Sequence, residues 1–109
     1  MKNDYLEQAV KFSEISKTLL ENVDELDRVI REAKEANAYN VLNDLLDDKT
    51  TLLKAVSESY ITSVLCLQLR RKPNDSILTV KALYHAIKMR LLIIRHNLMY
   101  RFYIKKHLE

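Results

Sequence analysis

The feature that most constrains this chain is what it lacks: glycine is absent and proline occurs once, at Pro73, among 109 residues. Tight turns rely on residues that accept a positive φ or are pre-set for a turn, so nearly every turn-rich architecture is ruled out. Hydrophobic residues make up 48% and charged residues 30%, too apolar for a disordered chain and too charged for a membrane-embedded one. We therefore expect one all-α domain over residues 1–109.

Two segments interrupt the apolar periodicity, residues 35–40 and residues 71–76. The first contains two asparagines, and the second contains Pro73 followed by three residue types that favour helix N-caps. The spacing predicts helices over about 4–36, 39–71 and 76–107, with Asp4 and Glu7 in capping-box spacing at the start of the first. Adjacent aspartates and threonines at 47–51 leave open a break in the second helix, which would give four helices.

Heptad spacing predicts how these helices pack. Every seventh residue of the second helix is apolar at Tyr39, Leu46, Leu53, Tyr60 and Leu67. The first helix has a similar apolar row, with a companion row three positions on: Gln8, Ile15, Asn22, Val29 and Ala36. Asn22 is the polar residue expected within that seam. Sustained heptads predict an elongated, antiparallel three-helix bundle with coiled-coil-like packing.

This outline resembles two known classes of helical protein. In length and heptad character it resembles a spectrin-type repeat, although the tryptophan usual in the first helix of that family is missing. In size and helicity it also resembles the helical chaperones of flagellar and type III export systems. The second resemblance implies an export-type chaperone as one functional alternative.

The third helix carries more apolar surface than a three-helix bundle requires. At about 100° per residue, its side chains form two apolar faces separated by charge. One face contains Val80, Tyr84, Ile87, Leu91, Ile94, Leu98 and Phe102. The other contains Leu78, Ala82, His85, Met89, Leu92, His96, Met99, Tyr100 and Tyr103. We expect one face to pack within the chain and the second to bind another chain.

The face rich in methionine, histidine and tyrosine is the predicted protein interface, because methionine and tyrosine make adaptable contacts. Its predicted interface residues are His85, Met89, Leu92, His96, Met99 and Tyr103. The resulting hypothesis is a non-enzymatic interaction or scaffold module that forms a homodimer or binds a partner protein.

Charge is distributed unevenly along the chain. Residues 1–54 contain 8 Lys/Arg and 12 Asp/Glu, whereas residues 55–109 contain 10 and 3. The two halves either attract each other within the bundle, with the acidic residues of the first helix as partners, or the basic half meets an acidic ligand. A nucleic-acid-binding subunit of a replication, defence or ribonucleoprotein assembly is therefore the alternative function. Its candidate contacts are Arg70, Arg71, Lys81, Lys88, Arg95 and Lys106.

No residue pattern predicts catalysis, a metal site or a cofactor. The three histidines are spaced by eleven residues, about 16 Å along a helix, so two of them cannot reach one ion. Arg90 and His96 match the loose spacing of HEPN-type ribonucleases, but a helix places them on different faces.

Aspartates 47 and 48 are expected to be solvated. Cys66 is the one cysteine, and we expect it to be a small, buried apolar side chain. Without an apolar leader or a spanning stretch, a cytoplasmic location away from membranes is expected.

Overall fold

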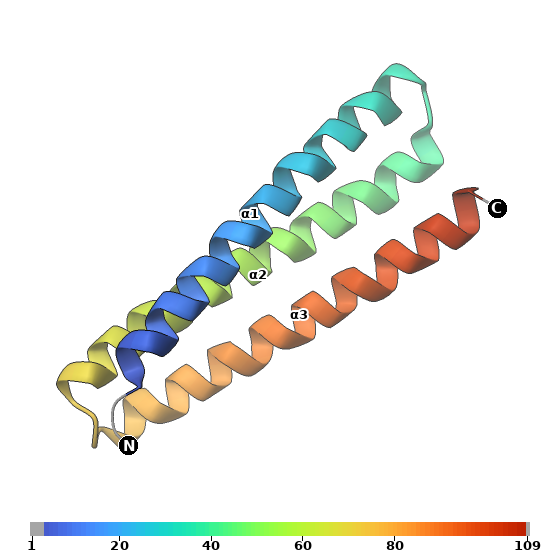
Figure 1. The fold of residues 1–109 in the computed structure, drawn as a ribbon. Helices are drawn as coiled ribbons and strands as arrows, with labels where there is room; N and C mark the ends of the chain where they lie inside the picture. The colour runs from blue at the N-terminus through green and yellow to red at the C-terminus, as the bar shows by residue number, and fades with distance from the viewer. Residues whose placement is uncertain (1–3, 109) are drawn as a thin grey trace.

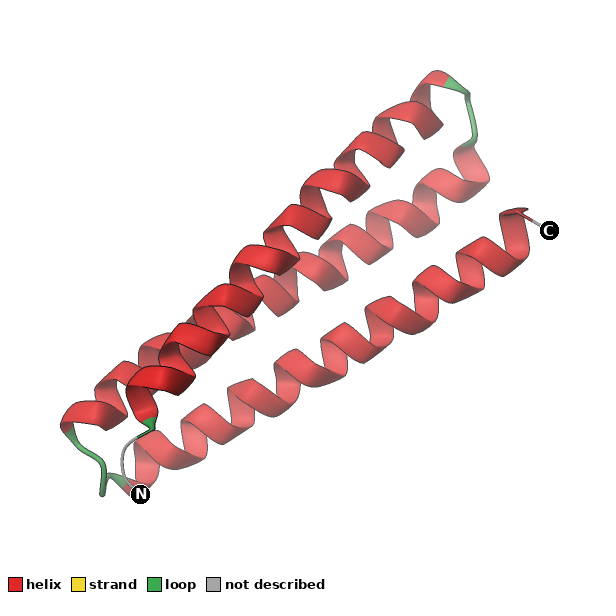
Figure 2. Ribbon diagram, viewed as in Figure 1, coloured by secondary structure: helices red, strands yellow, loops and turns green. Residues whose placement is uncertain are grey.

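The computed structural model describes the backbone of residues 4–108 and the side chains of residues 4–102. It consists of three helices, α1 (Tyr5–Glu35), α2 (Tyr39–Arg71) and α3 (Ser76–Leu108), joined by two short loops (Figures 1 and 2). The all-α prediction is confirmed, and each helix boundary lies within one residue of its prediction. The bundle is elongated, 54 × 18 × 18 Å with a radius of gyration of 16.9 Å, against about 13 Å for a compact domain of this length.

The second helix is continuous through the segment where a break was considered. Thr50 and Thr51 donate their hydroxyls to the carbonyls of Leu46 and Asp47, at 3.1 and 3.3 Å. These bonds to residues four positions earlier satisfy the hydroxyls without leaving the helical conformation. The three-helix alternative is therefore the observed one.

The ends of the helices show how a glycine-free chain turns. Asn37 has φ 57°, a left-handed conformation that asparagine tolerates better than most residues. The amides of Ala38 and Asn37 donate to the carbonyls of Ala33 and Lys34, at 2.9 and 3.1 Å. This pair of bonds is the Schellman motif that usually employs glycine.

The two predicted caps have different outcomes. Asp75 Oδ1 accepts the amide of Leu78 at 3.1 Å, so an N-cap forms at the start of α3, as the residues after Pro73 predict. The predicted capping box at Asp4 is wrong, because no side chain there forms a cap hydrogen bond.

The central helix of the bundle is α2, which packs against both α1 and α3. Within the described residues, no Cα atom of α1 lies within 8 Å of a Cα atom of α3. The main apolar cluster joins α1 to α2 and contains Leu19, Val23, Leu26, Ile30, Ala33, Leu45, Leu52 and Ala55. Among the described side chains of α3, the half-buried Leu92 and Ile93 are the hydrophobic ones packed against this cluster.

Two predicted seams are corrected by the structure. On α1 the companion row is Ala9, Ser16, Val23 and Ile30, one position beyond the predicted row, and Asn22 is exposed. On α2 the predicted core row is exposed instead: Tyr39 62%, Leu46 41%, Leu53 43%, Tyr60 64% and Leu67 45%. The α2 helix buries a second, more polar set of residues, which contacts both neighbours.

Small polar residues bring α1 close to α2. Ser59 and Ser63 on α2 donate their hydroxyls to the carbonyls of Phe12 and Ala9 on α1, at 2.6 and 2.7 Å. All buried hydroxyls need a partner, and here the partner is the backbone of the neighbouring helix. The N-terminal half of α1 is thus fixed on α2 by hydrogen bonds as well as by apolar contacts.

Candidate functional site

The predicted interface face of α3 lies against α2 within the same chain. Met89 is 2% exposed, Leu92 packs against the α1–α2 cluster, and Met99 is half-buried. His85 and His96 contact carboxylates of α2. The side chain of Tyr103 lies outside the described residues. The assignment of this face to a partner chain is therefore corrected: α2 already occupies it.

Two histidine–carboxylate pairs hold this intramolecular seam together. His96 donates from Nδ1 to Asp48 Oδ1 at 2.6 Å, and His85 Nδ1 pairs with Glu58 Oε1. Asp48 is 1% exposed and Glu58 is 9% exposed, so the expectation that Asp48 is solvated is wrong. Buried carboxylates are retained only when paired.

The antiparallel register explains both histidine–carboxylate pairs. It also provides a sequence signal from which the two pairs could have been predicted. In an antiparallel helix pair, the numbers of facing residues have a nearly constant sum. The sum is 143 for His85 with Glu58 and 144 for His96 with Asp48. The histidine spacing of eleven and the carboxylate spacing of ten therefore match across the seam.

The opposite face of α3 is the exposed one. We define the α3 outer row as six residues whose surfaces are each more than half exposed: Val80 65%, Tyr84 57%, Ile87 57%, Leu91 61%, Ile94 53% and Leu98 60%. Their alternating spacing of four and three is that of a coiled-coil seam. Leu83, at 58%, lies beside this row. At 1.5 Å per residue the row is about 27 Å long.

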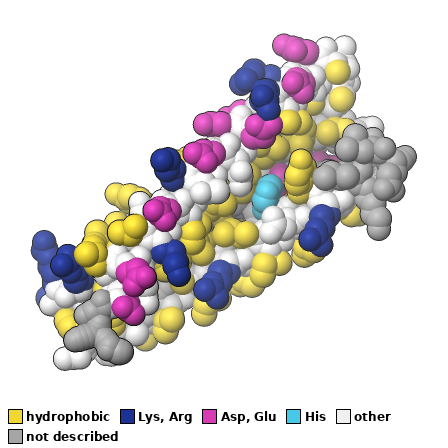
Figure 3. All heavy atoms as spheres, in the orientation of Figure 1, with side chains coloured by type: hydrophobic (Ala, Val, Ile, Leu, Met, Phe, Trp, Pro, Cys, Tyr) yellow, Lys and Arg dark blue, Asp and Glu magenta, His cyan; other side chains and the backbone are white. Residues whose placement is uncertain are grey.

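Basic residues flank the α3 outer row. Lys81, Lys88 and Arg95 are exposed and spaced by seven, so they follow one edge of the row. Arg90 and Arg101, also exposed, lie toward the other edge. Acidic side chains gather over α1 with basic ones among them, whereas hydrophobic and basic side chains follow α3 (Figure 3).

The basic candidates for nucleic-acid contact are not gathered in one place. Arg70 and Arg71 lie at the C-terminal end of α2 and are exposed. Lys88 Nζ lies 3.5 Å from Glu58 Oε2 and 5.6 Å from the centre of the Tyr84 ring. The side chain of Lys106 lies outside the described residues. Among the α3 lysines and arginines, Lys88 is the one with an ion pair in the described part of the chain, and its partner lies on α2 and not among the expected acidic residues of α1.

A groove runs between α1 and α3 above α2. Three cavities follow one another along it, with volumes of about 340, 350 and 330 Å³, and each is lined by residues of both outer helices. Figure 3 looks onto this groove, with a histidine visible inside it. Arg90 lines the first cavity and His96 the last, so the HEPN-like pair is separated.

Neither a metal centre nor a membrane span is found in the part of the chain that the structure describes. No three His, Cys, Asp or Glu side chains there come together as a possible metal site. No helix in that part has the length and apolar character needed to cross a bilayer. Comparisons with protein families, curated proteins and solved structures found no match to this chain.

Proposed function

We propose that this protein is a non-enzymatic interaction module whose α3 outer row binds an acidic, amphipathic helix of a partner protein. The single observation that carries the proposal is a heptad-spaced apolar row that is more than half exposed along its whole length. Monomeric proteins rarely expose apolar surface of this extent, and large patches mark interaction sites.

The spacing of the row favours a helix as its partner. Alternating steps of four and three keep the six side chains on one side of α3 over five helical turns, which matches the knobs of a facing helix. Burying one side chain such as Leu91 fully would contribute roughly 1.5–3 kcal/mol. A complementary helix therefore gains most of its binding free energy from this row.

The flanking charges favour an acidic partner over a second copy of α3. Two α3 helices packed through their outer rows would bring Lys81 and Arg95 of one copy near basic residues of the other. Like charges at these flanking positions oppose pairing, whereas glutamates on the partner helix would pair with them. Charge complementarity thus selects the class of partner.

The test uses two synthetic helices of about four heptads with leucine at both seam positions. One carries glutamate at the flanking positions and the matched control carries lysine. We expect the protein to bind the glutamate peptide, with affinity falling as salt rises, and not the lysine peptide. Isothermal titration calorimetry measures both.

Variants locate the binding to the α3 outer row. Leu91→Glu should weaken binding at least tenfold, from the burial that is lost. Leu53→Glu makes the same change at an exposed leucine of α2, so it is the matched control and should bind normally. Lys81→Glu combined with Arg95→Glu should reverse the preference toward the lysine peptide.

Three outcomes overturn the proposal. The first is equal binding of both peptides or of neither. The second is a wild-type dimer by light scattering that Leu91→Glu dissociates, which would assign the row to a second copy. The third is salt-sensitive binding of oligonucleotides that is lost in the charge-reversal variant but kept in Leu91→Glu, which would assign the basic edge to nucleic acid.

A further inference from the structure

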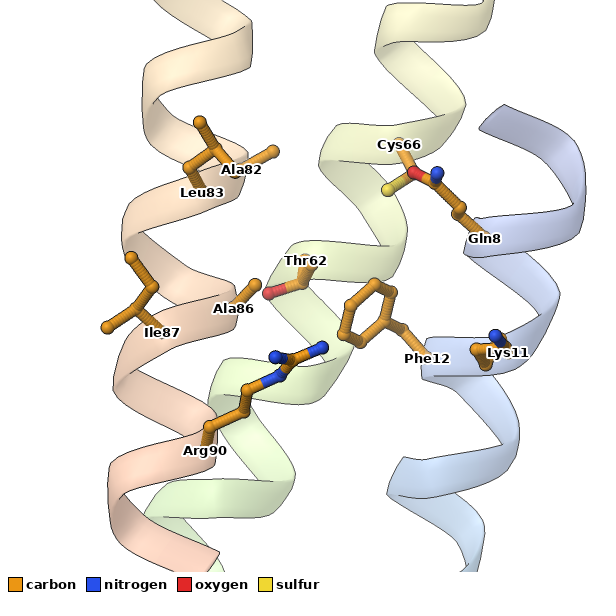
Figure 4. A pocket seen from close by; sticks show the side chains of 10 residues that line it. All are labelled: Gln8, Lys11, Phe12, Thr62, Cys66, Ala82, Leu83, Ala86, Ile87 and Arg90. Atoms are coloured by element: carbon orange, nitrogen blue, oxygen red, sulfur yellow. The ribbon is translucent and has the colours of Figure 1, made fainter. Parts of the chain in front are cut away.

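The first cavity of the groove combines a mainly apolar lining with two cations at its walls. It has a volume of about 340 Å³ and lies between the N-terminal half of α1, the C-terminal half of α2 and the N-terminal half of α3 (Figure 4). Ligand cavities generally range from 300 to 1,000 Å³. The size therefore suits one small organic molecule.

The cations come from different helices. Lys11 on α1 and Arg90 on α3 both line the cavity, and Figure 4 shows Arg90 extending from α3 toward Phe12 on α1. Among the described side chains, the ion pairs involve neither Lys11 nor Arg90. No acidic residue lines the cavity, so its field favours an anion.

The interior of the cavity is apolar. Phe12, Ala82, Leu83, Ala86 and Ile87 line it together with Cys66, whose side chain is 3% exposed. The Thr62 hydroxyl at the cavity floor already donates to the carbonyl of Glu58 at 2.7 Å. A ligand therefore meets one cationic side chain from each outer helix and mainly carbon elsewhere.

We infer that this cavity binds a medium-chain carboxylate, with the carboxylate between Lys11 and Arg90 and the alkyl chain along Ala86 and Cys66. An arginine guanidinium can hold a carboxylate by two parallel hydrogen bonds. The apolar walls gain from covering the chain. This inference goes beyond the proposed function, because it concerns a small-molecule cavity between the helices and not the binding of a partner helix to the α3 outer row.

The probe is decanoate, compared with decylammonium and acetate. We expect decanoate to bind with a 1:1 stoichiometry by isothermal titration calorimetry, while decylammonium, with the same chain and the opposite charge, and acetate, with the same head and no chain, do not. Cys66 is the one cysteine of the chain, so its reaction with a small disulfide reagent reports occupancy. Bound decanoate should slow this reaction in the wild-type protein.

Variants distinguish this cavity from other apolar surface. Lys11→Gln and Arg90→Gln should each weaken decanoate binding about tenfold, because each removes a charge-assisted contact. Arg95→Gln, on the same helix but outside the cavity, is the matched control. Ala86→Phe should fill the cavity and abolish binding, with circular dichroism confirming that the helices remain.

Equal binding of decanoate and decylammonium, or full affinity in Arg90→Gln, would overturn the inference. Protection of Cys66 separates these results from non-specific adsorption elsewhere on the α3 outer row, of which Ile87 alone lines the cavity that holds the thiol. Leu91→Glu should retain decanoate binding even when it loses the helical peptide. The two proposals can therefore fail independently.

Discussion

Asp48 has the least usual environment of any charged residue described here. Its side chain lies in the middle of α2 at 1% exposure, with His96 as the partner of Oδ1, while Oδ2 accepts no hydrogen bond within the described residues. Removing a charge from water is costly unless it is paired. The pair with His96 therefore offsets part of the cost of burying Asp48 between α2 and α3.

A first prediction follows from that pair. His96→Leu leaves the Asp48 carboxylate buried without its partner and should lower the free energy of unfolding by about 3 kcal/mol. The double variant Asp48→Leu, His96→Leu replaces the pair by apolar side chains and should recover most of that loss. Urea denaturation of the three proteins measures this, and a double variant as unstable as the single one would contradict it.

Cys66 supports a prediction about pH. Burial raises the pKa of its thiol, because desolvation disfavours the thiolate. The buried thiol contributes its full stability while it is protonated in both the folded and the unfolded state. That contribution falls as pH rises past the ordinary thiol pKa of about 8.5, because the unfolded chain then releases the proton more readily than the folded protein. The stability advantage of the wild-type protein over Cys66→Ala should therefore shrink between about pH 7 and pH 10. Denaturation curves at both pH values measure it, and an unchanged difference would refute the role of the thiol.

At the scale of whole helices, the structure gives a matched pair of N-terminal aspartates. Asp75 accepts the amide of Leu78, whereas Asp4 makes no side-chain cap bond at the start of α1. Both residue types are favoured before a helix, so local sequence does not distinguish them.

The third prediction compares the two positions. Asp75→Ala should lower the free energy of unfolding by about 1 kcal/mol, since an amide of α3 loses its partner. Asp4→Ala removes only a weak interaction with the helix dipole and should cost less than about 0.5 kcal/mol. Thermal denaturation of both variants measures the difference. Equal losses would show that the Asp75 hydrogen bond contributes nothing.

At the scale of the molecule, the three helices are not bound equally. The α1 and α2 helices share the main apolar cluster. The buried residues of α3 in the described part are Ala82 and Met89, and its remaining inner contacts are half-buried or polar. Regions with fewer buried apolar contacts open at lower free energy. The helix that carries the proposed docking surface is therefore the one least fixed by apolar burial.

The fourth prediction concerns this difference. Hydrogen exchange followed by mass spectrometry should show amides in the middle of α3 exchanging faster than those in the middle of α2. The glutamate peptide of the proposed interaction should slow exchange in α3, because it adds apolar contacts there. Equal protection of α2 and α3 in the free protein would mean that the polar seam holds α3 as firmly as the apolar cluster holds α1.

The candidate site was only partly predictable from sequence. Two apolar faces on residues 76–107 are evident from the spacing, and one of them is exposed along its length. Which of the two faces packs inside the chain was predicted the wrong way round: the face with Met89 and the histidines, expected to bind another chain, lies against α2. The outer row contains the larger aliphatic side chains, whereas the inner face combines Ala82 and Met89 with two histidines. A ranking by hydrophobicity would bury the outer row, since apolar residues are the ones most often found inside.

Local sequence is sufficient to predict the number of helices, their lengths and their ends. These properties depend on local interactions: the absence of glycine, the φ of Pro73, the tolerance of Asn37 for a left-handed conformation and the short reach of helical hydrogen bonds. Tertiary structure alone decided which faces of α2 and α3 turn inward. Each helix carries two sets of side chains with the same period, so the periodicity is satisfied either way. The choice was made by contacts between residues tens of positions apart, where the histidines of α3 meet the carboxylates of α2 in antiparallel register.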